Sequence, residues 1–196
     1  GVKGSVLDGR VNTSVSLFRG ETRNRAIFDD NNYPCGTSPD GECYIAGGKV
    51  LSEGIEIEAS GEVFPNFQLA ASYTYTHKKL LEGSEDNMFR PTYSPDHLVK
   101  VWGDYSFTDQ LEGLSLGGGV RFQSQTSRTV GTVEVVQDPY AIFSARIGYQ
   151  FNEHLQAALT VDNLFDKKYY QTIGAPAWGS VYGDPRTFTL SLKSKF

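Results

Sequence analysis

Residues 114–123 have the sequence LSLGGGVRFQ, in which apolar or small residues alternate with more polar ones. In an extended strand, successive side chains point to opposite faces of the sheet. One face of this strand would carry Leu114, Leu116, Gly118, Val120 and Phe122, and the other Ser115, Gly117, Gly119, Arg121 and Gln123. The segment therefore predicts a β-strand with one apolar face and one wet face.

The same alternation recurs along the chain in both directions. It covers residues 141–151, 155–161 and 187–196 after this segment, and 11–17, 55–63, 67–75 and 99–107 before it. Their β-branched and aromatic residues favour strands over helices. The pattern predicts about eight complete strands of roughly ten residues each, and no helix.

The expected connections alternate in length. Short turns fall at 7–9, 64–66, 108–113 and 152–154, and long polar loops at 29–43, 80–95, 126–138 and 167–184. This order is typical of an all-β, antiparallel, up-and-down transmembrane β-barrel. A Greek-key β-sandwich would not be expected to keep it.

Aromatic residues gather at both ends of the expected strands. Phe64, Phe67, Phe107, Phe151 and Phe196 lie near the short turns, and Tyr75, Tyr169, Tyr170 and Tyr182 near the long loops. Aromatic rings favour the two interfaces of a membrane. The positions predict two aromatic girdles.

The composition agrees with a barrel and excludes other classes of protein. The chain is 39% hydrophobic, with a mean hydropathy of −0.36, and has no apolar run of the roughly 18 residues that a spanning helix needs. A barrel needs no such run, because only alternate side chains face lipid. The net charge of −5, without a cluster of basic residues, argues against a nucleic-acid partner.

Two cysteines, Cys35 and Cys43, lie in a polar segment rich in turn residues. We expect a disulfide between them, formed in an oxidising compartment. A zinc site is the weaker alternative, because no further Cys or His lies nearby.

The sequence offers no catalytic group. His77, His97 and His154 fall on separate elements, and His97 follows Ser94 and Asp96 on a segment whose adjacent side chains point to opposite faces. We expect no enzyme activity, no metal site and no cofactor, with an outer-membrane hydrolase as a poor alternative.

The first residues look like the cut end of a further strand. Residues 1–6 are extended in style, and neither a signal peptide nor a starting Met precedes them. An open set of strands would expose unpaired backbone groups to lipid. The small inward residues also suit a wide lumen, so we expect further strands upstream.

Residues 161–170, VDNLFDKKYY, residues 182–188, YGDPRTF, and the terminal Phe196 resemble the C-terminal end of TonB-dependent siderophore receptors. Residues 4–12, GSVLDGRVN, and 94–97, SPDH, are similar to other segments of that family. The resemblance covers essentially the whole chain. Terminal Phe196 is similar to the signal read by the barrel-assembly machinery, and we expect Asn163, Asp166 and Arg186 to order the last loop.

The resemblance implies that residues 1–196 are the last eight or so strands of a barrel of about 22 strands in the bacterial outer membrane, with a plugged lumen. It implies TonB-dependent uptake of a ferric siderophore. The expected partners are the chelate, outer-membrane lipid, the N-terminal plug, the remaining strands, and the TonB complex, which would act through the missing N-terminal part.

Aromatic and Arg side chains facing a vestibule would suit a bulky anionic chelate. The candidate ligand-binding residues are Arg90, Tyr93, Trp102, Arg128, Tyr170, Trp178 and Tyr182. For each of them, an interface or loop-packing role is the alternative.

Three alternatives stay open from the sequence. A small stand-alone structural or adhesive barrel would begin and end near these residues. A soluble β-sandwich would bury the apolar rows between two sheets. A TonB-dependent receptor could instead take up haem or cobalamin, because the sequence does not choose between these cargoes and a siderophore.

Overall fold

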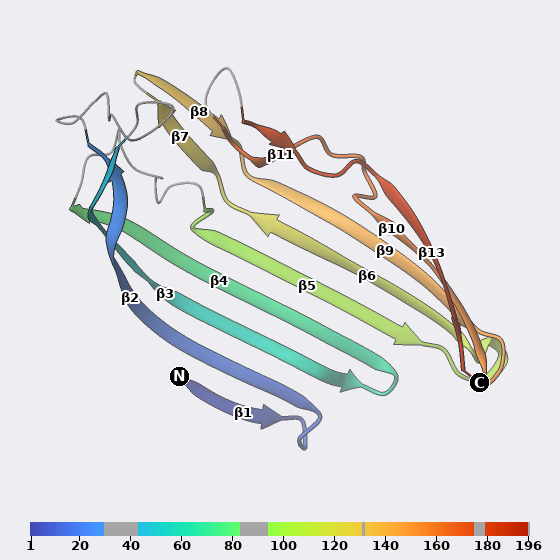
Figure 1. The fold of residues 1–196 in the computed structure, drawn as a ribbon. Helices are drawn as coiled ribbons and strands as arrows, with labels where there is room; N and C mark the ends of the chain where they lie inside the picture. The colour runs from blue at the N-terminus through green and yellow to red at the C-terminus, as the bar shows by residue number, and fades with distance from the viewer. Residues whose placement is uncertain (30–42, 83–93, 131, 175–178, 196) are drawn as a thin grey trace.

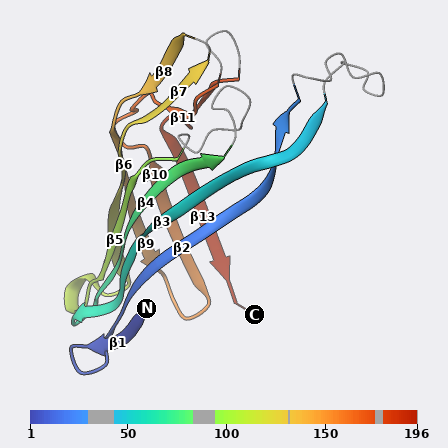
Figure 2. The ribbon, with the colours of Figure 1, turned by 90° about the vertical axis from the view of Figure 1, so that its left-hand side faces the viewer.

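The computed structural model describes residues 1–29, 43–82, 94–130, 132–174 and 179–195. Most of them form one curved antiparallel sheet (Figures 1 and 2). Its nine strands run in the order β1-β2-β3-β4-β5-β6-β9-β10-β13. Their bounds are β1 Val2–Val6, β2 Val11–Phe28, β3 Tyr44–Phe64, β4 Phe67–Glu82, β5 His97–Ser106, β6 Leu114–Gln123, β9 Tyr140–Gln150, β10 Leu155–Asp162 and β13 Thr187–Ser194.

Each strand of the sheet pairs with the next one along the chain, apart from two short hairpins inserted in connections. These are β7 (Thr126–Val130) with β8 (Val133–Gln137), and β11 (Tyr170–Thr172) with β12 (Val181–Tyr182). The predicted up-and-down antiparallel topology is confirmed. Eight long strands and the shorter β1 form the described sheet, which is not closed, since β1 and β13 are its two edges.

The register aligns the apolar residues into rows across the sheet. One row joins Val15, Ile57, Tyr73, Val99, Phe122 and Ala141. Another joins Tyr105, Leu116, Ile147, Leu159 and Leu190. Many of these side chains are exposed, up to 77% for Leu190. An apolar face left uncovered by protein is what a lipid-facing sheet requires.

The other face is polar and lined by small residues. One row contains Ser14, Glu58, Ser72, Lys100, Arg121 and Ile142, and the next contains Asn12, Ser60, Ala70, Trp102, Gly119 and Ser144. We call this side the lumenal face, because in a closed barrel it would line the interior. In each strand predicted from alternation, the polar side chains lie on this lumenal face.

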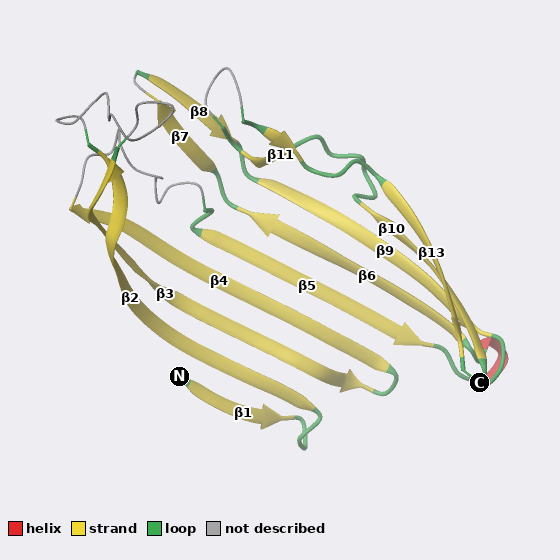
Figure 3. Cartoon of the chain, in the orientation of Figure 1, coloured by secondary structure: helices red, strands yellow, loops and turns green. Residues whose placement is uncertain are grey.

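The four short turns lie where the sequence predicts them, at one end of the sheet (Figure 1). The turn after β1 has left-handed backbone at Leu7, Asp8 and Gly9, and Asn66 has a φ of 67° in the turn between β3 and β4. The connection from β5 to β6 contains the only helical turn of the described residues, the 3-10 segment η3 (Asp109–Leu111), coloured red in Figure 3. No helix in the described parts of the chain is long and apolar enough to cross a membrane.

The predicted lengths of three strands and two predicted loops are wrong. β2, β3 and β4 have 18, 21 and 16 residues rather than about ten, so β3 begins at Tyr44 and β4 ends at Glu82. Ion pairs join the charged ends of these strands, including Arg19 to Glu53 at 3.8 Å and Lys49 to Glu21 at 3.6 Å. Backbone pairing therefore continues beyond the apolar rows, where side-chain hydropathy carries no signal.

The segments 126–138 and 167–184 are likewise not irregular loops, because each contains a hairpin. The β7–β8 hairpin pairs in full register from Thr126 with Gln137 to Val130 with Val133. The β11–β12 pairing is shorter and joins Tyr170 to Tyr182. Both hairpins lie at the end of the sheet opposite the short turns (Figure 1).

The aromatic girdle at the short-turn end is confirmed among the described residues. Phe64 stacks on Phe67 with ring centroids 4.6 Å apart, Tyr105 meets Phe107 at 4.9 Å, and Tyr149 meets Phe151 at 5.0 Å. Phe196 lies outside the described residues.

At the long-loop end, Tyr75 belongs to the apolar face and lies 4.9 Å from the His97 ring. Tyr169 does not belong to this girdle, which corrects the prediction. Tyr169 is only 6% exposed, and its ring lies 4.4 Å from that of Tyr140. Tyr140 is on the lumenal face of β9. Two adjacent tyrosines, Tyr169 and Tyr170, therefore have different surroundings.

Candidate ligand pocket on the lumenal face

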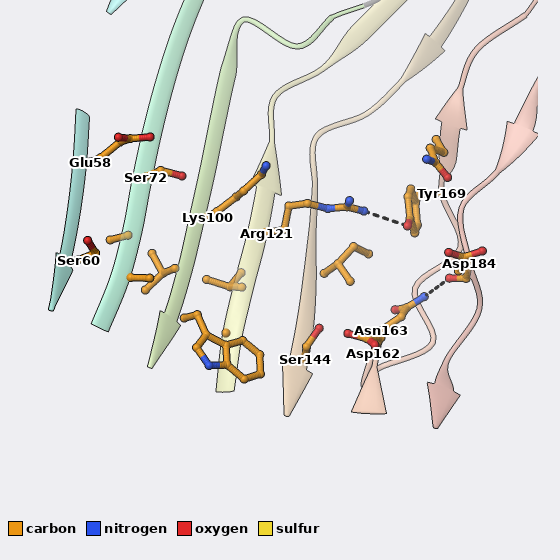
Figure 4. A pocket seen from close by; sticks show the side chains of 18 of the residues that line it. Glu58, Ser60, Ser72, Lys100, Arg121, Ser144, Asp162, Asn163, Tyr169 and Asp184 are labelled. Carbon is orange, nitrogen blue, oxygen red and sulfur yellow. Dashed lines mark hydrogen bonds between the residues drawn. The ribbon is translucent and has the colours of Figure 1, made fainter. Parts of the chain in front are cut away.

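A pocket of about 700 Å³ lies between the lumenal face and the connection from β10 to β13 (Figure 4). The sheet contributes residues from β3, β4, β5, β6 and β9 and Asp162 at the end of β10, and the connection contributes Asn163, Tyr169, Gln171, Asp184 and Pro185. The pocket thus has a wall from the sheet and a second side from residues 162–185.

Trp102 lies in the wall of this pocket, because neighbouring glycines make room for its ring. A Cβ atom built on Gly119 would be 2.6 Å from Cε3 of Trp102 and 2.5 Å from the backbone oxygen of Val101, and one on Gly117 would be 2.9 Å from Cζ2. The indole therefore lies against the bare backbone of β6. A Cβ atom built on Gly118, which faces the opposite side of the sheet, would have only one atom within 4 Å, the Ser144 backbone oxygen at 3.6 Å.

Gly119→Ala should lower the free energy of unfolding by about 2 kcal/mol, because the added methyl group overlaps the indole and the backbone of β5. Gly118→Ala is the matched control and should change it by less than about 0.5 kcal/mol. Urea unfolding of the complete receptor in detergent micelles measures both. Equal effects of the two substitutions would contradict the packing of Trp102 described above.

Glycine 117 also lets an ion pair cross a strand. Asp104 on β5, Gly117 on β6 and Arg146 on β9 share one lumenal row. With no side chain between them, Nη1 of Arg146 reaches Oδ2 of Asp104 at 3.1 Å and Oγ of Ser115 at 3.2 Å. The charge of Arg146 is therefore balanced within the wall.

Arg121 joins the wall to the β10–β13 connection. Its Nη2 donates a hydrogen bond of 3.0 Å to the hydroxyl of Tyr169, and its guanidinium carbon lies 5.8 Å from the centre of that ring. The Tyr169 ring packs on Tyr140, and the backbone NH of Gly183 donates to the Tyr169 carbonyl at 2.9 Å. The Tyr169 side chain thus attaches the β10–β13 connection to the lumenal face.

Asn163 fixes the start and end of the same connection. Its side-chain amide donates to the backbone oxygens of Lys167 and Asp184, at 2.9 and 3.0 Å, and its Oδ1 accepts from the Lys167 NH at 2.8 Å. The residue is 3% exposed and has a φ of 52°. Asn tolerates this left-handed backbone better than most residues.

Asp166 makes a similar contact, because its Oδ1 accepts from the Arg186 backbone NH at 3.0 Å. These bonds agree with the expectation that Asn163 and Asp166 order the last loop. Arg186 takes part through its backbone.

The predicted ligand-binding residues do not gather in one place. Trp102 lines the pocket. Arg128, half-buried on β7, and Tyr170 and Tyr182 belong to the two hairpins. Arg90, Tyr93 and Trp178 lie outside the described residues, as does Cys35. Cys43 is disulfide-bonded, and its pairing with Cys35 stays a prediction.

The two hairpins contact each other at the long-loop end. The Tyr170 backbone NH donates to Oε1 of Gln137 at 2.7 Å, which ties β11 to β8. Tyr170 and Tyr182 stack with ring centroids 4.5 Å apart, and their hydroxyls lie 3.0 Å apart. This hydrogen bond raises the pKa of Tyr170, because ionisation would remove the shared proton. Tyr182 is 64% exposed.

Sequence reasoning missed four residues that shape the pocket: Lys100, Arg121, Tyr169 and Asp184. Lys100 and Arg121 were assigned to the polar face of their strands, but nothing in the sequence placed them side by side. In the described chain, no three His, Cys, Asp or Glu side chains lie close enough together to hold a metal ion.

Comparisons with known proteins agree with this architecture. Residues 1–164 match the family model of the TonB dependent receptor-like β-barrel. The ferric-pyoverdine M114 receptor PbuA of Pseudomonas sp. strain M114 is 41% identical over 201 residues, and the ferripyoverdine receptor of Pseudomonas aeruginosa strain PAO1 is 34% identical over 204 residues. Both alignments cover 100% of this chain and 24% of the relative.

A solved structure gives the same answer for the fold. The crystal structure of the Pseudomonas aeruginosa ferripyoverdine receptor of the outer membrane, bound to ferripyoverdine, superposes with a TM-score of 0.82 at 32% identity. It covers 99% of this chain and 26% of that one. The chain spans about a quarter of the length of the curated relatives. It belongs to the family of TonB-dependent receptor β-barrels of the outer membrane.

Proposed function

We propose that the chain is part of a receptor that takes up a ferric siderophore across the outer membrane in a TonB-dependent way. The observation that carries this proposal is the 41% identity to a ferric-pyoverdine receptor over the full chain. Ferric pyoverdine is therefore the first cargo to test. The relatives named above are receptors, and we propose that this protein too has no enzyme activity.

We further propose that residues 1–196 form the C-terminal segment of the barrel domain, with the plug and the earlier strands supplied by the rest of the protein. The open edges of β1 and β13 support this, because each exposes backbone groups that need a partner in lipid. The lumenal face would line the transport path, and the TonB complex would act on the N-terminal part.

Uptake of radiolabelled iron tests the proposed function. The complete receptor is expressed in a strain that lacks its own pyoverdine receptors, with and without active TonB. We expect uptake of iron from ferric pyoverdine only with active TonB. Uptake of haem or cobalamin in place of every ferric siderophore tested would overturn the assignment of cargo.

We also propose that the ligand first meets the hairpins at the long-loop end. Stacked tyrosines, one of them exposed, and an Arg at the same end of the sheet suit a bulky anionic chelate. Arg128, Tyr170 and Tyr182 supply these groups, and Arg90, Tyr93 and Trp178 are the remaining candidates. Trp102 would contact the ligand further inside, on the lumenal wall.

Tyr182→Ala and Trp178→Ala should each weaken binding of the ferric siderophore to the complete receptor by about tenfold, and Trp102→Ala tests the inner position. Phe165→Ala is the matched control, because Phe165 is 71% exposed and packs against Phe143 on the apolar face. Its affinity should be unchanged. Tryptophan fluorescence quenching measures the affinity. If all three variants bind as tightly as the wild type, Tyr182, Trp178 and Trp102 do not belong to the ligand site.

A further inference from the structure

The lumenal face carries a pair of cations that directly oppose each other. Lys100 on β5 and Arg121 on β6 are register partners, and both line the pocket. Like charges at such opposed positions repel each other. Side chains of the row on either side, Ser72 and Ile142, carry no charge that would offset them.

Neither cation forms an ion pair within the described residues. The hydrogen bond from Arg121 goes to the neutral hydroxyl of Tyr169. Arg146, two lumenal rows further along the same wall, is by contrast compensated by Asp104. The lumenal wall therefore balances one of these three charges and leaves two adjacent ones unbalanced.

The carboxylates that line the same pocket lie to either side of the pair (Figure 4). Glu58 belongs to β3, two strands away from Lys100, and accepts a hydrogen bond of 3.2 Å from Ser14. Asp162 is the last residue of β10 and Asp184 belongs to the β10–β13 connection, both beyond Arg121. The space in front of Lys100 and Arg121 is thus open to an anion from outside the described chain.

We propose that the Lys100–Arg121 pair binds a carboxylate side chain of the plug domain, with Tyr169 beside it. This inference rests on the proposed function, since it requires the receptor's plug. A large barrel of this kind has a filled lumen. Filling it removes water from the wall, and two desolvated cations then require an anion in contact with them.

An acidic side chain of the plug fits better than the ferric chelate. The connection at 162–185 is fastened over the pocket by Asn163 and Tyr169. A bulky ligand arriving from the long-loop end would meet this connection first. A single carboxylate already present in the lumen needs only the space between two adjacent strands.

Zero-length cross-linking of the complete receptor tests the proposal. A water-soluble carbodiimide joins an ammonium group to a carboxylate that touches it, forming an amide as the carbodiimide takes up the water and becomes a urea. Mass spectrometry of the digest should show the peptide containing Lys100 joined to an Asp or Glu of the plug. Lys100→Arg keeps the positive charge and should lose this cross-link alone.

A second measurement uses the double variant Lys100→Met/Arg121→Met. It should raise the rate at which a protease cleaves the plug by about tenfold, because the plug has lost a docking contact. Lys193→Met is the matched control, since Lys193 is on the lumenal side of β13 opposite Gln156. It should leave the rate unchanged.

A Lys100 cross-link found only with acids of residues 1–196, or none at all, overturns the proposal, as does an unchanged cleavage rate in the double variant. Uptake of ferric siderophore by the wild-type receptor is measured in parallel. If the wild-type receptor transports normally but forms no cross-link between Lys100 and the plug, this inference alone is overturned. Absence of transport in a receptor that forms the cross-link overturns the proposed function alone.

Discussion

Replacing Asn163 with alanine is expected to lower the free energy of unfolding by about 4 kcal/mol. The substitution removes three hydrogen bonds and leaves the Lys167 NH and the Lys167 and Asp184 oxygens without their partner. Each lost bond of this kind costs about 1 kcal/mol. Alanine in left-handed backbone adds about 1 kcal/mol more.

Two further variants separate these contributions. Asn66→Ala changes another Asn with positive φ, but one that is exposed in a short turn, so it should report the backbone cost alone, about 1 kcal/mol. Asn163→Asp keeps the Oδ1 acceptor but sets a second oxygen against the Lys167 and Asp184 carbonyls, so it should cost at least as much as Asn163→Ala. Urea unfolding of the complete receptor in micelles gives the free energies, and protease cleavage within 163–184 should rise in parallel. If Asn163→Ala costs no more than Asn66→Ala, Asn163 does not fasten the loop.

The second large effect is expected from Ala71→Arg, which should cost about 3 kcal/mol. Ala71 belongs to the apolar face, opposite Ala59 and Val101. It lies on β4 midway between the aromatic residues Phe67 and Tyr75. An arginine there would place a charge in the centre of the hydrocarbon layer, where water cannot solvate it.

Ala70→Arg is the matched control, because it makes the same change at the next position of the same strand. Ala70 lies on the lumenal face between Ser60 and Trp102, and should lose less than about 1 kcal/mol. Unfolding in lipid vesicles compares the two variants. Equal losses would show that the two faces of the sheet do not differ in their surroundings, and the lipid-facing assignment would fail.

The alternation of residues determined most of the fold. Rows such as Phe143, Ile147 and Phe151 identified their face without any structure, because a strand repeats every two residues whatever its neighbours are. The four short turns were equally visible, since Asp8, Gly9 and Asn66 favour the left-handed backbone that a tight turn requires. The ends of β2, β3 and β4 were not visible, because apolar and polar residues do not alternate there: Val50 and Leu51, for example, are adjacent and both buried.

The candidate site was only partly visible. The phase of β5 placed Trp102 on the polar face, and the motif at 161–170 marked a structured end. That Tyr169 turns inward while Tyr170 turns to the hairpins could not be predicted, because the two side chains have the same chemistry and differ only in what the folded chain places beside them.

Sequence alone thus determined which side chains share a face within each strand, because that property is local. Tertiary structure decided which strand positions face each other, and with them the Lys100–Arg121 pair, the ion pair across Gly117 and the seat of Trp102. These contacts depend on register between strands, which is set by backbone pairing and turn geometry over the whole sheet.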